Sequence, residues 1–171
     1  ACAVNMLNPV GTTGIYKVGT GIPTTTGQTS TINVPAGDIY AYQMVNRGGS
    51  NWNCYGVYAT SPGIYKWSSI DNGATWTARG SITTANVYGL TAANNGASVD
   101  LYATTTVSTT STIIKVTDTA AFNANISGTA STIVTAPTNT FFRGIAFAPI
   151  SATAPLIVTT GSPAAVNTEY G

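Results

Sequence analysis

The chain has 171 residues and a formal net charge of +1, and only 6% of its residues are charged, against about a quarter in an ordinary soluble domain. A surface with so few charges has no long-range field to attract nucleic acid or anionic lipid, and no apolar run approaches the roughly 20 residues that cross a bilayer. We therefore expect neither nucleic-acid binding nor membrane insertion.

Strands are the predicted elements throughout the chain. Thr, Val, Ile and Tyr are frequent, and 18 glycines and 8 prolines break the chain into short runs, a pattern typical of all-β sandwiches, barrels and propellers. The sequence Asn94-Asn95-Gly96 predicts a tight hairpin, because Asn and Gly adopt positive φ at little cost. In chain order, the expected strands are Gly14–Val18, Ile39–Val45, Cys54–Ala59, Gly63–Trp67, Trp76–Ile82, Val87–Ala92, Val99–Thr104, Thr112–Val116, Ser131–Thr135 and Phe142–Phe147.

An internal repeat spans most of the sequence. The phrase GIYK occurs at Gly14–Lys17 and again at Gly63–Lys66, and TIIK occurs at Thr112–Lys115, so each lysine follows the previous one by 49 residues. The phrases VYAT and LYAT, in the first two units, align Tyr58 with Tyr102. Units of this length with about four strands each are typical of the blades of a β-propeller.

The repeat predicts the organisation of the chain. We expect an all-β fold, a β-propeller segment of about three four-stranded blades over residues 1–150, with repeats near 14–62, 63–111 and 112–150. A propeller closes with about four to eight blades. Because three blades do not close, we expect the chain to be part of a larger propeller or to assemble with other chains.

The stretch SIDNGATW, which begins at residue 69, fits the pattern Ser-x-Asp-x-Gly-x-Thr-Trp. Gly73 allows the positive φ of a tight turn, and Asp71 can accept hydrogen bonds from backbone amides of that turn. The hydroxyls of Ser69 and Thr75 can complete the network, and Trp76 can cover it with apolar surface. The pattern resembles the Asp-box of sialidases, sortilin-like receptors and other propeller proteins. This resemblance implies a structural hairpin between outer strands of a blade.

No set of residues in the sequence predicts catalysis. Glycoside hydrolysis usually needs two carboxylates across the scissile bond, and the other acidic residues are scattered: Asp38, Asp100, Asp118 and Glu169. The chain has no histidine that could activate a nucleophile or complete a zinc site. We therefore expect no catalytic residue, metal or cofactor. The alternative is a fragment of an Asp-box glycoside hydrolase whose catalytic residues lie outside this chain.

Two further pairs of residues are candidate sites. Trp52 lies in a polar run after Arg47 that has no counterpart in the other units, so Trp52 and Arg47 are candidate ligand contacts. The cysteines, Cys2 and Cys54, can form one disulfide or remain two buried thiols.

Longer phrases extend the resemblance. GIYKVGTGIPTTTGQT from residue 14, VYGLTAANNGASVDLYATT from residue 87 and NTFFRGIAFAP from residue 139 resemble the last blades of propellers in large secreted bacterial proteins. Residues 151–171 resemble a linker and the start of an immunoglobulin-like domain. Such proteins look like cargo of the type IX secretion route, which implies a secreted or cell-surface location. The resemblance also implies an O-glycan at Thr119, in the sequence Asp118-Thr119-Ala120.

We therefore expect a non-catalytic propeller segment of a secreted or cell-surface bacterial protein. Its expected role is adhesion or binding, or service as secretion-system cargo. The expected partners are the rest of its own propeller, secretion or cell-surface proteins, and glycans. A further alternative is a self-assembling structural subunit, because open sheets present unpaired strand edges that can pair between copies.

Overall fold

The computed structural model describes residues 2–5, 13–20, 22, 24–58, 61–84 and 86–148. These residues form eleven strands in three antiparallel sheets, and no helix occurs among them. The all-β class predicted from the sequence is therefore confirmed. No helix long and apolar enough to cross a membrane is found in this part of the chain. The predicted immunoglobulin-like segment, residues 151–171, lies outside the described residues.

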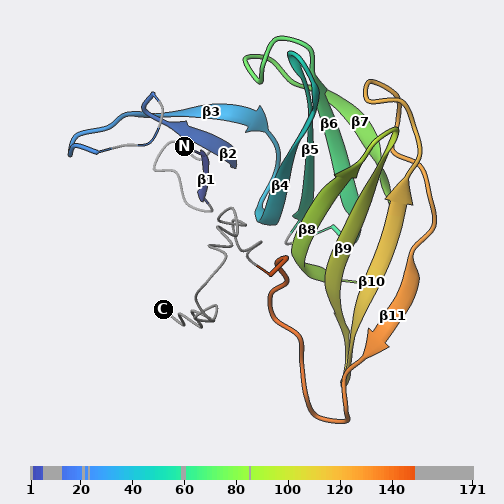
Figure 1. Cartoon of the computed structure of the whole chain (residues 1–171). Helices are drawn as coiled ribbons and strands as arrows, with labels where there is room; N and C mark the ends of the chain where they lie inside the picture. The colour runs from blue at the N-terminus through green and yellow to red at the C-terminus, as the bar shows by residue number, and fades with distance from the viewer. Residues whose placement is uncertain are drawn as a thin grey trace, which may run out of the picture.

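Each sheet is built from strands that follow one another along the chain. The first sheet has the order β1 (Cys2–Asn5), β2 (Gly14–Val18) and β3 (Ser30–Pro35). The second has the order β4 (Ile39–Gly48), β5 (Asn51–Tyr58), β6 (Ile64–Ser69) and β7 (Thr77–Ile82). The third consists of β8 (Val87–Asn95), β9 (Ser98–Val107), β10 (Thr110–Asp118) and β11 (Ser131–Thr135), again in chain order. Figure 1 shows the second sheet between the other two.

Apolar side chains hold neighbouring sheets together. One cluster packs the second sheet on the third, with Val57, Leu101 and Val116 at most 1% exposed. A second cluster joins the first sheet to the second and includes Ile15, Cys54 and Trp67. Because burial of each large apolar side chain stabilises a fold by about 1.5–3 kcal/mol, these two layers fix which sheet faces which.

The strand register reveals the repeat in three dimensions. In each sheet, the lysine of the repeat lies opposite one residue of the preceding strand: Lys17 opposite Cys2, Lys66 opposite Tyr55, and Lys115 opposite Tyr102. The strands β2, β6 and β10 are therefore equivalent, and so are β1, β5 and β9. The first two 49-residue units read from the sequence start at the GIYK strand, so each covers parts of two neighbouring sheets.

The register corrects one detail of the sequence alignment. The phrases VYAT and LYAT align Tyr58 with Tyr102, but the residue equivalent to Tyr102 is Tyr55, which also lies opposite the repeat lysine. The physical reason is that successive side chains of a strand point to opposite faces of the sheet, so Tyr55 and Tyr58, three residues apart, lie on different faces. Cys54 and Leu101, which precede these two tyrosines, are both completely buried, and each lies on the face of its sheet that points toward the preceding sheet.

Most predicted strands are present, with three departures. The ranges Gly14–Val18 and Ser131–Thr135 are reproduced, and the predicted hairpin forms, with Asn95 opposite Ser98 and Gly96 at φ 63°. The strands β1 and β3 were not predicted. The strand β3 emerges from a long Thr-rich run without alternation, so its sequence carries no period-2 signal.

The third departure is the predicted strand Phe142–Phe147, which is wrong. This segment forms no ladder with any described strand. Its start is held by a hydrogen bond from the Phe142 amide to Ser111 Oγ at 3.0 Å. A Cβ placed on Gly89 would lie 3.1 Å from Gly144 Cα, so the segment packs closely against β8. The segment has the composition of a strand, but no described strand forms a ladder with its backbone groups.

Candidate functional site

The SIDNGATW segment forms the turn between β6 and β7, and short polar side chains shape it. The Asp71 carboxylate accepts hydrogen bonds from Ser69 Oγ at 2.6 Å, from the Thr75 amide at 2.9 Å and from Thr75 Oγ1 at 2.5 Å. Ser69 Oγ in turn accepts the Gly73 amide at 2.9 Å. The hydrogen bonds from Ser69 and then Thr75 hold the pKa of Asp71 well below its usual range. All partners of this carboxylate lie within the turn.

Two indole rings fix this turn to its surroundings. Trp76 Nε1 donates to the Gly73 carbonyl oxygen at 3.1 Å, and Gly73 has a φ of 83°. Trp52 Nε1, from the neighbouring β4–β5 hairpin, donates to Asn72 Oδ1 at 3.0 Å. The Asn72 amide donates to the Ser50 carbonyl oxygen at 2.9 Å. The turn and the loop that carries Trp52 therefore form one continuous surface.

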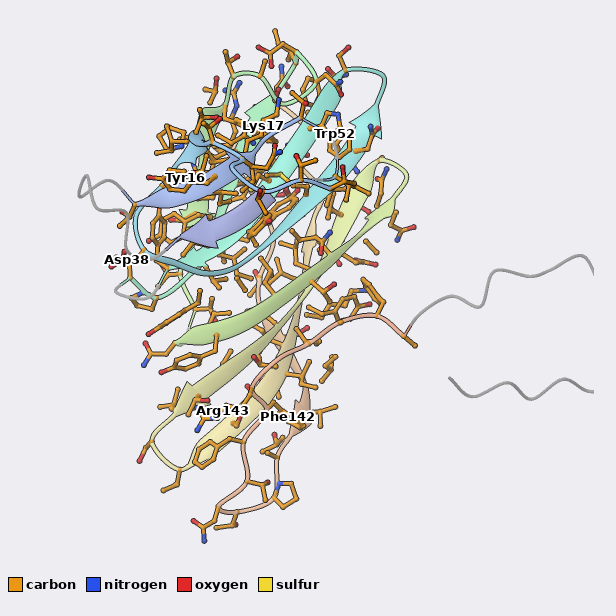
Figure 2. All side chains as sticks on the ribbon, turned by 90° about the vertical axis from the view of Figure 1, so that its left-hand side faces the viewer. Tyr16, Lys17, Asp38, Trp52, Phe142 and Arg143 are labelled. Carbon is orange, nitrogen blue, oxygen red and sulfur yellow. The ribbon has the colours of Figure 1, made fainter. Side chains whose placement is uncertain are left out.

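A cleft of about 200 Å³ lies on this surface, where the first sheet meets the second. Both indole rings line the cleft, together with an ammonium group, two amides and a thioether. These residues are Trp52, Trp76, Lys17, Asn33, Asn72 and Met44. Figure 2 shows Lys17 and Trp52 at the same end of the molecule, with Asp38 well away from them. No carboxylate occurs among the described residues that line the cleft.

The environment of Lys17 is best understood from its equivalent, Lys66. Lys66 reaches from the second sheet toward the third, and its ammonium Nζ lies 2.8 Å from Asp118 Oδ2, with both side chains at most 1% exposed. The Lys66 ammonium also donates to the Ala121 carbonyl oxygen at 3.2 Å. Tyr55 Oη donates to the same carboxylate oxygen at 2.8 Å. Between the second and third sheets, the repeat lysine is therefore neutralised within a buried network.

Lys17 has no such carboxylate opposite it. Asp118 follows Lys115 by three residues, and the residue three after Lys66 is Ser69, whose hydroxyl is used inside the turn. Among the described residues, no ion pair involves Lys17, and its side chain is exposed at the cleft. The cleft thus combines an unneutralised cation with two aromatic rings and two amides.

Arg47, the other predicted ligand contact, lies at the end of β4 and binds the β8–β9 hairpin. Its Nη1 donates to Asn94 Oδ1 and, at 2.9 Å, to the Ser98 carbonyl oxygen. Its Nη2 donates to the Ala97 carbonyl oxygen at 2.7 Å. These contacts join the second sheet to the third and place Arg47 apart from the residues that line the cleft. Ligand contact by Arg47 stays a prediction.

The remaining predicted sites lie at separate positions. Thr119 is exposed directly after β10, with Oγ1 3.3 Å from Ser127 Oγ, so its hydroxyl is accessible. Cys54 is completely buried between the first two sheets. The strand β1 carries Cys2, whose side chain lies outside the described part of the structure. The O-glycan and the disulfide stay predictions. No group of three or more metal-ligating side chains occurs in the described regions.

The sequence pointed to Trp52 and to the turn but missed Lys17, Asn33 and Asn72 as neighbours. One signal was present. All three repeat units carry the lysine, but only the third unit has an aspartate three residues after it. Its meaning becomes visible only when the sheets are stacked. Comparison of the chain with protein-family models, with curated proteins and with solved structures gives no significant match.

Proposed function

We propose that the three sheets are consecutive blades of a β-propeller. Each is an antiparallel meander, and the repeat lysines occupy equivalent positions in all three. The first strands of the second and third sheets, β4 and β8, run side by side, and Tyr40 stacks on Tyr88 with ring centroids 5.3 Å apart. Radial stacking about an axis accounts for both features, since it brings the inner strands of successive blades together.

We further propose that the chain is a non-catalytic binding module of a secreted or cell-surface bacterial protein. The SIDNGATW turn and the longer phrases that resemble secreted bacterial propellers support this location. The hydrogen bonds of Asp71 support a structural role for the acidic residue that most resembles a catalytic one. Adhesion is the role that fits an exposed cleft on a rigid sheet scaffold, and export as secretion cargo is compatible with it.

The ligand that we propose for the cleft is a carbohydrate that carries a carboxylate. Indole faces bind the apolar faces of sugar rings, and convergent amide groups give orientation, as in small-molecule sites generally. The observation that carries the proposal is the difference between Lys17 and Lys66. Lys66 is neutralised by Asp118, whereas the corresponding place opposite Lys17 is open to solvent. A carboxylate of the ligand would occupy the position that Asp118 occupies in the next pair of sheets.

Calorimetric titration of the intact chain with oligogalacturonate tests this proposal. The fully methyl-esterified oligosaccharide is the matched probe, because it keeps the sugar rings and removes the charge. We expect binding of the acidic form and at least about tenfold weaker binding of the ester, since a hydrogen bond to a charged group contributes about 1.5–3 kcal/mol. Lys17→Met should weaken binding of the acidic form to the level of the ester.

Lys115→Met is the matched control variant. It removes the equivalent lysine of the third sheet, which pairs with Asp100 at 3.1 Å and does not line the cleft, so binding should be unchanged. Equal binding of the acidic and esterified sugars would overturn the proposed role of Lys17. A glycan array on which the chain binds no acidic sugar would overturn the carbohydrate proposal, and hydrolysis of any sugar would favour the glycoside hydrolase alternative.

A further inference from the structure

The connections that follow the equivalent strands β6 and β10 differ in length. Residues 119–130 separate β10 from β11, whereas only residues 70–76, which belong to the SIDNGATW turn, separate β6 from β7. The longer connection lies over Lys66, whose ammonium donates to the Ala121 carbonyl oxygen at 3.2 Å. The shorter connection leaves Lys17 exposed, and both border the same cleft. The compact turn is therefore part of what keeps the cleft open.

Both indole N–H groups at the cleft donate to residues of this turn. Trp52 Nε1 donates to Asn72 Oδ1 at 3.0 Å, and Trp76 Nε1 donates to the Gly73 carbonyl oxygen at 3.1 Å. A tryptophan side chain has this one donor and no acceptor. The two rings can therefore contact a ligand only through their apolar surface. Polar groups of a ligand have to be bound by the other residues that line the cleft.

The hydrogen bond from Trp52 fixes the orientation of the Asn72 amide. Because an indole N–H group can only donate, the amide turns its oxygen toward Trp52, and its nitrogen Nδ2 is directed away from that ring. Among the described residues, no protein group accepts a hydrogen bond from Nδ2. Asn72 is exposed and lines the cleft together with Lys17. Both residues thus offer hydrogen-bond donors to a ligand.

The backbone of the turn does not by itself require an asparagine at this position. Asn72 has a φ of 59°, in the left-handed region that glycine adopts more readily. The pattern Ser-x-Asp-x-Gly-x-Thr-Trp also specifies no residue there. The amide is accounted for by its surroundings instead, with Trp52 on one side and the cleft on the other.

We propose that Asn72 is a specificity-determining residue of the cleft, which positions Trp52 through its amide oxygen and donates from Nδ2 to an acceptor of the sugar that Lys17 binds. This inference rests on the proposed function. No carboxylate occurs among the described residues that line the cleft. The site therefore presents donors to an acidic sugar. It would disfavour an amino sugar, whose ammonium groups would face the Lys17 ammonium and the Asn72 amide protons.

Two substitutions of Asn72 separate its contacts. Asn72→Gly removes the whole amide and suits the positive φ, so urea unfolding should show little change in stability. Asn72→Asp keeps an oxygen that accepts the Trp52 proton but replaces the Nδ2 donor by an anionic oxygen. We expect calorimetric titration with oligogalacturonate to give about tenfold weaker binding for Asn72→Gly, the factor that a hydrogen bond to a charged group contributes. Binding by Asn72→Asp should be weaker still, because like charges then meet.

Asn139→Gly is the matched control. Asn139 is also exposed, has a φ of 64° and does not line the cleft, so this variant should bind oligogalacturonate as the unsubstituted chain does. A short oligomer of glucosamine is the matched probe, and the unsubstituted chain should bind it at least about tenfold more weakly than oligogalacturonate.

Proton–nitrogen spectra report on the contact with Trp52 without any ligand. Exchange of the Trp52 indole proton with water should be faster in Asn72→Gly, which lacks the acceptor, and unchanged in Asn72→Asp, which keeps it. The indole proton of Trp76, bonded to the Gly73 carbonyl oxygen, is the internal reference and should be unaffected.

The outcomes distinguish this inference from the proposed function. Unchanged binding by Asn72→Gly, with weaker binding by Lys17→Met, would overturn the inference and leave the proposed function intact. Weaker binding by Asn72→Gly than by Asn72→Asp would show that the amide only supports Trp52, because the aspartate keeps that support. Equal exchange of the Trp52 indole proton in all variants would refute the positioning of Trp52. Absence of binding by the unsubstituted chain would overturn the proposed function and the ligand contact of Asn72 with it.

Discussion

Lys66 Nζ lies 2.8 Å from Asp118 Oδ2, and this ion pair connects the second sheet to the third with both side chains withdrawn from solvent. Burial of two charges is costly, and it is tolerated where additional hydrogen bonds satisfy both groups. Asp118 Oδ1 accepts the Ser127 amide at 3.0 Å, and Tyr55 Oη donates to Oδ2 at 2.8 Å. The pair therefore requires the two sheets to face each other with residues 119–127 folded over them.

The first prediction concerns the alkaline limit of stability. Burial first, and then the charge of Asp118, raise the pKa of the Tyr55 hydroxyl far above its usual value. A raised folded-state pKa means that the stability contribution is complete below the unfolded pKa of about 10 and is lost as the pH rises above it. We expect the free energy of unfolding to fall above about pH 10, by about 1.4 kcal/mol per pH unit for this proton.

Urea unfolding at a series of pH values measures this slope. In Tyr55→Phe the alkaline loss should be smaller by the contribution of one proton, while between pH 6 and 8 the two proteins should have equal slopes. An alkaline slope that is the same in both proteins would show that Tyr55 is not held in the buried network.

The second prediction concerns acid and the SIDNGATW turn. Hydrogen bonds from Ser69 and Thr75 lower the pKa of Asp71 in the folded chain. A lowered folded-state pKa means that the stability contribution is present above the unfolded pKa, about 3.9, and is lost as the pH falls toward the folded value. Asp71→Asn should therefore flatten the loss of stability between about pH 5 and pH 2.

Urea unfolding followed by tryptophan fluorescence at a series of acidic pH values measures this slope. Ser69→Ala, which removes the first of the two donors, should give an acid slope between those of the wild type and Asp71→Asn. If the acid slope of Asp71→Asn equals that of the wild type, the carboxylate is not bound by the turn.

The third prediction concerns the contact between β8 and the segment Phe142–Phe147. A methyl group on Gly89 would lie 2.8 Å from Thr104 Oγ1 and 3.1 Å from Gly144 Cα, and this backbone can move only by separating the segment from the sheet. We expect Gly89→Ala to destabilise the chain by about 1–3 kcal/mol, the usual cost of overpacking. Chemical denaturation provides the measurement.

Gly144→Ala is the matched control for this contact. A methyl group on Gly144 would point into open space, and Gly144 does not have a positive φ, so its substitution should change stability little. Equal destabilisation by the two substitutions would contradict the close packing of the segment against β8.

Local signals in the sequence were enough for most of the fold. From Ile114 to Asp118, buried residues alternate with partly buried ones, and the hairpin at Gly96 has the residues that positive φ requires. The strand β3 and the unpaired segment Phe142–Phe147 were not predictable in this way. Pairing depends on whether a partner edge is available, and no local pattern contains that information.

The candidate site was predictable only in part. Trp52 stood out because its loop has no counterpart in the other units, and the turn stood out because of its motif. Lys17 did not stand out, because a lysine that recurs in each repeat suggests a structural role. The stacking of the sheets separates the two roles, since Lys66 meets Asp118 and Lys17 meets a cleft.

A double-mutant cycle on Lys66 and Asp118 tests the stacking of equivalent sheets most directly. Asp118→Asn alone should cost about 3–5 kcal/mol, because it leaves a buried ammonium without its counter-charge. Asp100→Asn, which breaks the more exposed pair with Lys115, should cost at most about 1 kcal/mol. The account predicts that Lys66→Met in the Asp118→Asn background restores part of the lost stability, with a coupling energy of about 2 kcal/mol or more. Additive effects of the two substitutions, with no coupling, would contradict it.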